Sequence, residues 1–150
     1  MQNIRAKIYS IPQHRRANLS TQASATFTVK SWDEKPYAEM DGGRKLTKAR
    51  VVCAYQGDIE GEGTREYLMA YGADGKGNYV GIEHVIGRIG NKSGSFVMQL
   101  TGTFEGHVVN NTWIIAHDSG TGELQGVTGG GEGGITGPGP YPIAFHYAFE

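Results

Sequence analysis

Glu83 is the single carboxylate on an otherwise apolar face of residues 79–104, a stretch that alternates with period two. Apolar alternation on both sides of Asn91-Lys92 predicts two antiparallel strands joined by a tight turn. In that register the apolar face pairs Tyr79 with Phe104, Glu83 with Leu100, Val85 with Met98 and Gly87 with Phe96. A carboxylate desolvated among such side chains is disfavoured in its charged form, so its pKa would move toward neutrality. Glu83 is therefore the first candidate for general acid or base chemistry.

Arg65 and Tyr67, on the preceding strand, are the candidate partners of Glu83. A loop centred on Gly75 places Tyr67 opposite Glu83 and Arg65 diagonal to it, and it avoids setting Glu66 against Glu83. Two interpretations follow. Glu83 could move a proton while Tyr67 and Arg65 orient charge, or the three could form a buried ion pair that only stabilises the fold.

Aromatic and aliphatic side chains on the same face could line a site for a small apolar molecule. The candidate ligand-binding residues are Tyr79, Phe96, Met98, Leu100, Phe104, Trp32 and Trp113. Tryptophans are more often core residues than parts of a ligand site, so Trp32 and Trp113 could be either. Glu34 and Glu60 are weaker candidates for chemistry, because the sequence does not determine which way they face.

Other motifs give little support to alternative chemistries. Asp118-Ser119-Gly120-Thr121 matches a short aspartic-protease pattern, but a capped turn explains it better. The five histidines lack the paired spacing of a metal site, and the glycine-rich run at 120–126 lacks the helix of a dinucleotide fingerprint. We expect no metal and no cofactor. Cys53 is expected to be a buried, inert thiol.

The elements that must position these residues are strands. Glycine accounts for 24 of 150 residues and aromatics for 15, and no core segment has helical periodicity, which favours a strongly curved all-β protein. An eight-stranded antiparallel barrel is expected, because closure removes edge strands and leaves an interior for side chains or one small ligand. The predicted strands are 23–30, 46–56, 59–71, the two halves of 79–104, 108–116, 123–128 and 141–149, with Pro36 ending regular pairing after the first and 129–140 forming a flexible or extended loop.

Charge and composition limit the partners. The net charge of −1 gives no reason to expect a nucleic acid or an anionic membrane surface. Residues 1–22 hold four basic residues and no acid, so we expect an N-terminal arm, either a loose terminus or a segment that wraps a neighbouring subunit, before one domain at 23–150. Residues 4–9 alternate and could add a short strand. The lone cysteine and the lack of a signal-peptide pattern favour a cytoplasmic protein.

Several ordered motifs resemble the bacterial domain-of-unknown-function family 3224 over roughly residues 23–148. They are Trp32-Asp33-Glu34, the runs at 57–61, 79–83 and 93–96, and Ser119 to Leu124 with Gly126 and Gly129. Members of that family look like relatives of the allene oxide cyclase barrel, an eight-stranded antiparallel barrel shared with dirigent proteins. The resemblance implies a mostly apolar lumen for a small organic molecule, homo-oligomers, and no metal or organic cofactor. It brings no established activity.

Three functional hypotheses remain at this stage. The barrel could be an isomerase, cyclase or lyase that moves a proton with Glu83, so whether it is an enzyme stays open. It could instead bind a small hydrophobic metabolite without catalysis, or be an oligomeric structural protein with a filled lumen. A fully paired Glu83 would favour binding, whereas an unpaired Glu83 facing a pocket would favour catalysis.

Overall fold

The structure, a computed structural model, describes residues 20–150 and consists of antiparallel strands. A short 3-10 turn, η1 (Asp41–Gly43), joins the first two strands. The strands are β1 (Thr21–Glu39), β2 (Lys45–Gly57), β3 (Ile59–Tyr71), β4 (Gly77–Ile89), β5 (Lys92–Glu105), β6 (Val108–Ile115), β7 (Thr121–Gly122), β8 (Val127–Ile135) and β9 (Tyr141–Phe149).

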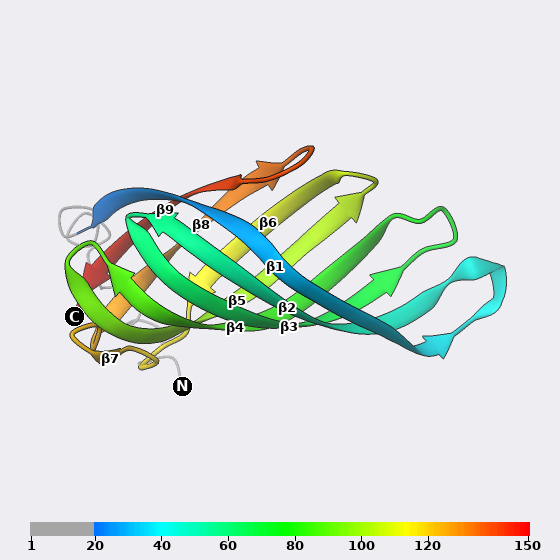
Figure 1. Ribbon diagram of the computed structural model, residues 1–150. Coiled ribbons are helices and arrows are strands. Elements are labelled where there is room, and N and C mark those ends of the chain that lie inside the picture. The colour runs from blue at the N-terminus through cyan, green and yellow to red at the C-terminus, as the bar shows by residue number, and fades with distance from the viewer. Residues whose placement is uncertain (1–19) are drawn as a thin grey trace, which may run out of the picture.

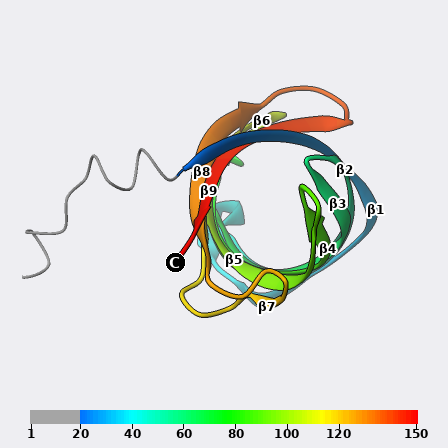
Figure 2. The ribbon, with the colours of Figure 1, turned by 90° about the vertical axis from the view of Figure 1, so that its left-hand side faces the viewer.

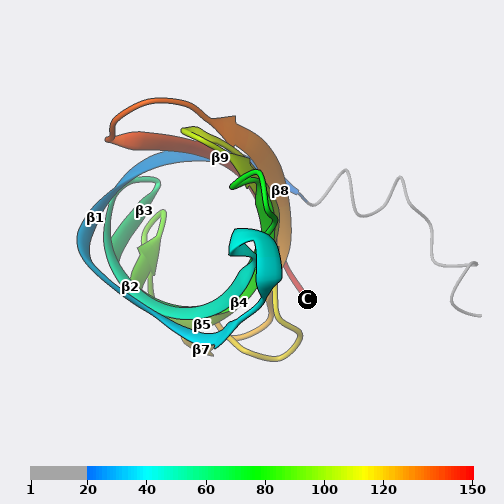
Figure 3. The same ribbon diagram turned by 90° about the vertical axis from the view of Figure 1, so that its right-hand side faces the viewer.

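Eight of these strands close into one barrel. The hydrogen-bonded order is β4-β3-β2-β1-β9-β8-β6-β5, and β5 pairs back with β4, while the two-residue β7 adds to β5. The closed ring is seen down its axis in Figures 2 and 3, and Figure 1 shows long hairpins reaching beyond the ring at one end. The prediction of an all-β, eight-stranded antiparallel barrel is confirmed. Among residues 20–150, no helix is long and apolar enough to cross a membrane.

The facing predicted for the β4–β5 hairpin is confirmed, but its register is shifted by two residues. Glu83 lies opposite Met98 rather than Leu100, because the turn consists of Gly90 and Asn91 instead of Asn91 and Lys92. Gly90 has a φ of 59°, a conformation that favours glycine at the first central position of a hairpin turn. A shift of two residues keeps every side chain on its predicted face. Glu83 is accordingly buried, and its neighbour His84 is exposed.

The β3–β4 pairing is also shifted by two residues from its prediction. Arg65 lies directly opposite Glu83, and Tyr67 lies opposite Gly81. The loop from Gly72 to Lys76 is closed by a hydrogen bond from the Gly72 amide to the Lys76 carbonyl, 2.7 Å long. This tighter loop places the opposite charges of Arg65 and Glu83 directly across from each other. The sequence argument excluded only a register with Glu66 opposite Glu83, so it did not distinguish this register from the predicted one.

Two of the predicted strands have different bounds. Residues 123–126 of the predicted strand 123–128 form a turn, Val127 and Thr128 begin β8, and β8 includes much of the glycine-rich run predicted to be a loop. β1 continues through Pro36 to Glu39. Pro36 is in register with Thr47 and a register irregularity follows it before Ala38, so the proline does not end the pairing. Thr21 and Gln22 of the predicted arm already pair with β9. Residues 1–19 of the arm, including the possible strand at 4–9, lie outside the described residues.

Glycines on the inner face make room for aromatic rings from neighbouring strands. A Cβ at Gly81 would lie 2.6 Å from the Tyr67 ring, and one at Gly102 would lie 2.4 Å from the Tyr79 hydroxyl. Each of these rings therefore lies flat across the strand next to its own, which covers the glycine and lets the sheet curve tightly. This arrangement explains why so glycine-rich a chain still builds an apolar interior.

Candidate functional site

The charged centre of the barrel interior is a network of four side chains. Arg65 Nε lies 3.0 Å from Glu83 Oε2, although its N–H is not aimed at any acceptor among the described residues. The Tyr55 hydroxyl lies 2.8 and 2.7 Å from the two Glu83 carboxylate oxygens and donates to them. The two terminal nitrogens of Arg65 donate to the hydroxyls of Tyr67 and Tyr55, each at 2.9 Å. Both oxygens of Glu83 are thus occupied from within the protein.

Gly63 provides the space in which the Glu83 carboxylate lies. A Cβ at Gly63 would be 2.1 Å from Glu83 Oε2 and 3.1 Å from the Tyr55 ring. The Glu83 side chain is fully buried, and the Arg65 guanidinium lies 4.5 Å from the centre of the Phe27 ring. The network is therefore enclosed by β1, β2, β3 and β4.

Burial keeps the tyrosines of this network as neutral phenols near neutral pH. Desolvation raises the pKa of Tyr55 well above its usual value, despite the opposing effect of the nearby Arg65 charge. Desolvation also raises the pKa of Tyr67, again against the effect of Arg65. Burial by itself would lower the pKa of Arg65, but Tyr55 and Glu83 raise it well above its usual value. The site consequently consists of neutral tyrosine hydroxyls around the Arg65 cation, whose charge is balanced by Glu83.

Tyr55 is the member of this network that the sequence analysis missed. Its signal was the alternation of Val51, Cys53 and Tyr55 in the second strand, which places all three on one face. The expected burial of Cys53 is confirmed, and this burial raises the pKa of its thiol to about 11.

A pocket of about 310 Å³ opens next to the network, at the end of the barrel formed by the β5–β6 and β8–β9 turns. Arg65 and Tyr67 are in its wall, and Glu83 is not. Val29, Val51 and Met69 add aliphatic surface, and Asn111 and His107 add polar groups. Its aromatic wall consists of Phe27, Trp32, Tyr67, Tyr79, Phe104 and Tyr141.

The predicted ligand-binding residues fall into two groups. Tyr79, Phe104 and Trp32 line the pocket, and Trp32 is half exposed at its edge. The other four, Phe96, Met98, Leu100 and Trp113, are buried in the core and are not in the pocket wall. The sequence predicted that these side chains share the inner face, but the depth of each along the barrel axis depends on strand register and on how the interior is packed.

Glu34, which the sequence could not orient, lies beside the edge of the pocket, where it contacts Trp32. Its carboxylate accepts hydrogen bonds from Thr47 at 2.6 Å, from Tyr71, and from the Trp32 indole at 2.9 Å. Partial burial would raise the pKa of Glu34, but these hydrogen bonds lower it below its usual value. Glu34 therefore anchors Trp32 at the pocket edge. Glu60, the other weak candidate, is paired with Arg88 on the surface at 2.8 Å.

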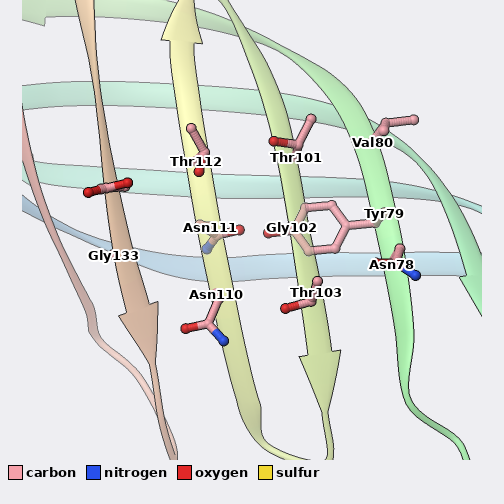
Figure 4. Close-up of a pocket in the computed structure, with 11 residues that line it drawn as sticks. Asn78, Tyr79, Val80, Thr101, Gly102, Thr103, Asn110, Asn111, Thr112 and Gly133 are labelled. Carbon is pink, nitrogen blue, oxygen red and sulfur yellow. The ribbon is translucent and has the colours of Figure 1, made fainter.

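A larger concavity, about 790 Å³, lies on the outside of the barrel across β4, β5, β6 and β8. Figure 4 shows short polar side chains along it, with the Tyr79 ring reaching across β5 at Gly102. The other lining side chains shown there are Asn78, Val80, Thr101, Thr103, Asn110, Asn111 and Thr112. This groove has no aromatic wall of its own and no buried charge, so the pocket inside the barrel is the better candidate site.

Two further predictions can be located in the structure. Ser119, in the protease-like motif, exchanges hydrogen bonds with the backbone of Val97, so this segment continues the barrel wall beside β5. No cluster of three or more His, Cys, Asp or Glu side chains that could hold a metal occurs within residues 20–150.

Comparisons with known proteins agree with the fold. A family model described as a protein of unknown function, DUF3224, matches residues 23–147. A crystal structure of a protein of unknown function from the DUF3224 family of Shewanella oneidensis MR-1 is similar, with 27% sequence identity and a TM-score of 0.68. That match covers 87% of this chain and 98% of the other. No curated protein matches the chain.

Proposed function

The chain belongs to the DUF3224 family, and we propose from its own residues that it binds a small, mostly apolar organic molecule inside the barrel. The observation that supports this most is the 310 Å³ pocket with an aromatic wall and few polar groups. Its size lies at the small end of the range for ligand sites, and such a mixture of apolar walls with isolated polar groups is typical of them.

Binding has more support than catalysis by Glu83. Glu83 is fully buried, is absent from the pocket wall, and has both carboxylate oxygens engaged by Tyr55. A general base must come within hydrogen-bond reach of the proton that it removes. Proton transfer in an isomerase, cyclase or lyase reaction remains a prediction, and a Glu83→Gln variant with unchanged turnover would argue against it.

The binding proposal can be tested with 2-ethylnaphthalene as an apolar probe in equilibrium dialysis. Val29 is 40% exposed and lines the pocket, so a Val29→Trp variant should fill the opening and weaken probe binding at least about tenfold. Ile86 is 62% exposed on the outer face and lines neither the pocket nor the outer groove, so Ile86→Trp is a matched control that should bind like the wild type. Absence of binding to the wild type, or equal binding by the two variants, would contradict the proposal.

A further inference from the structure

The Tyr67 hydroxyl combines burial, a cationic donor and a place in the pocket wall. It accepts a hydrogen bond from Arg65 Nη1, and the Tyr67 side chain is 6% exposed. Its own O–H makes no hydrogen bond to any of residues 20–150. A buried hydroxyl proton without an acceptor is unfavourable, and in the pocket wall it is available to a bound molecule.

The Arg65–Glu83 pair sets the charge that a ligand would encounter there. Glu83 compensates the Arg65 cation, and Tyr55 connects the two through hydrogen bonds. An anionic ligand would therefore find no uncompensated positive charge at this point. The hydrogen bond from Arg65 polarises the phenol, which strengthens it as a donor to an oxygen atom.

We propose that the ligand carries a neutral carbonyl-type oxygen that accepts a hydrogen bond from Tyr67, with its apolar part against Trp32, Phe104 and Tyr79. This inference rests on the proposed function and adds the chemical class of the ligand, an apolar ketone, aldehyde, ester or amide. Arg65 acts as a positioning residue that directs the Tyr67 proton toward the pocket. Tyr79 also lines the pocket, but it makes no side-chain hydrogen bond to the described residues, so nothing orients its hydroxyl.

The test compares 2-acetylnaphthalene with 2-ethylnaphthalene, two probes of nearly equal shape that differ in a carbonyl group. Their absolute affinities differ because water solvates the ketone better, so the informative quantity is the ratio of their dissociation constants. Tyr67→Phe should weaken ketone binding about fivefold, which corresponds to about 1 kcal/mol, and leave hydrocarbon binding unchanged. Tyr79→Phe should leave the ratio as it is in the wild type.

A second measurement needs only the wild-type protein. The carbonyl stretch of bound 2-acetylnaphthalene should shift to lower wavenumber than in hexane, because a hydrogen bond weakens the C=O bond. Binding of both probes without that shift, or a ratio unchanged by Tyr67→Phe or altered by Tyr79→Phe, would overturn the inference while leaving apolar binding intact. Failure of both probes to bind would overturn the proposed function and this inference with it.

Discussion

At the scale of single residues, two carboxylates in the barrel differ in how they are held. Glu83 is fully buried and paired with a cation, whereas Glu34 is partly exposed and accepts hydrogen bonds from neutral donors. Buried ion pairs are costly to desolvate and strongly destabilising when one partner is removed, so Glu83 contributes mainly to the integrity of the network. Glu34 instead fixes the position of Trp32, a residue of the pocket wall.

We predict that Glu34 stabilises the fold in a pH-dependent way. Its pKa is lowered on folding, so its contribution is present above the unfolded pKa near 4.5 and is lost as the pH falls through the folded pKa. In urea denaturation near neutral pH, the free energy of unfolding of the wild type should exceed that of Glu34→Gln by no more than about 1 kcal/mol. This difference should disappear in acid. Trp32 fluorescence in a Trp113→Phe background should shift with the substitution. A pH-independent gap would contradict this prediction.

At the scale of elements, β8 shows how a glycine run can be a strand. Gly131 lies opposite Trp113, and a Cβ there would be 2.5 Å from the Ala144 carbonyl oxygen and 3.0 Å from the Trp113 ring. The strand thus gains its apolar contacts from the side chains of its neighbours, and its own sequence carries no alternation. A pattern-based prediction could not find β8 for this reason.

We expect Gly131→Ala to destabilise the barrel by about 1–3 kcal/mol, because the added methyl group overlaps packed atoms. Gly134, in the same strand, offers a matched control, since a Cβ there would meet only ordinary contacts at 3.5 Å or more. Gly134→Ala should change the free energy of unfolding by less than about 0.5 kcal/mol. Equal effects of the two substitutions in urea denaturation would argue against this account of β8.

At the scale of the whole molecule, closure leaves the barrel with an outer face that is partly apolar. Leu68 lies opposite Val80, and Ile82 and Ile114 both flank Gln99, so four large aliphatic side chains lie on β3, β4 and β6, with Gln99 of β5 between Ile82 and Ile114. Each of the four is about half exposed in the single chain. Several large apolar side chains exposed on one face often mark a protein interface.

We propose, as the family resemblance implied, that the protein forms a homo-oligomer, and that its interface is on this face. Sedimentation equilibrium should give a mass of at least two chains, and Ile82→Glu should shift it toward the monomer because a buried unpaired charge is costly. Thr28→Glu, on the exposed outer side of β1, should leave the mass unchanged. A monomeric wild type at all concentrations tested would rule out this proposal.

The sequence by itself determined the barrel class, most of its strands and the inner position of Glu83, Arg65 and Tyr67. These follow from period-two alternation, which is a local property and survives a register error of two residues. Only the tertiary structure decided that Arg65 lies directly opposite Glu83, that Tyr55 occupies both carboxylate oxygens, and that the pocket ends short of Glu83. Those features depend on the conformation of each turn and on packing between strands distant in sequence, which no single strand encodes.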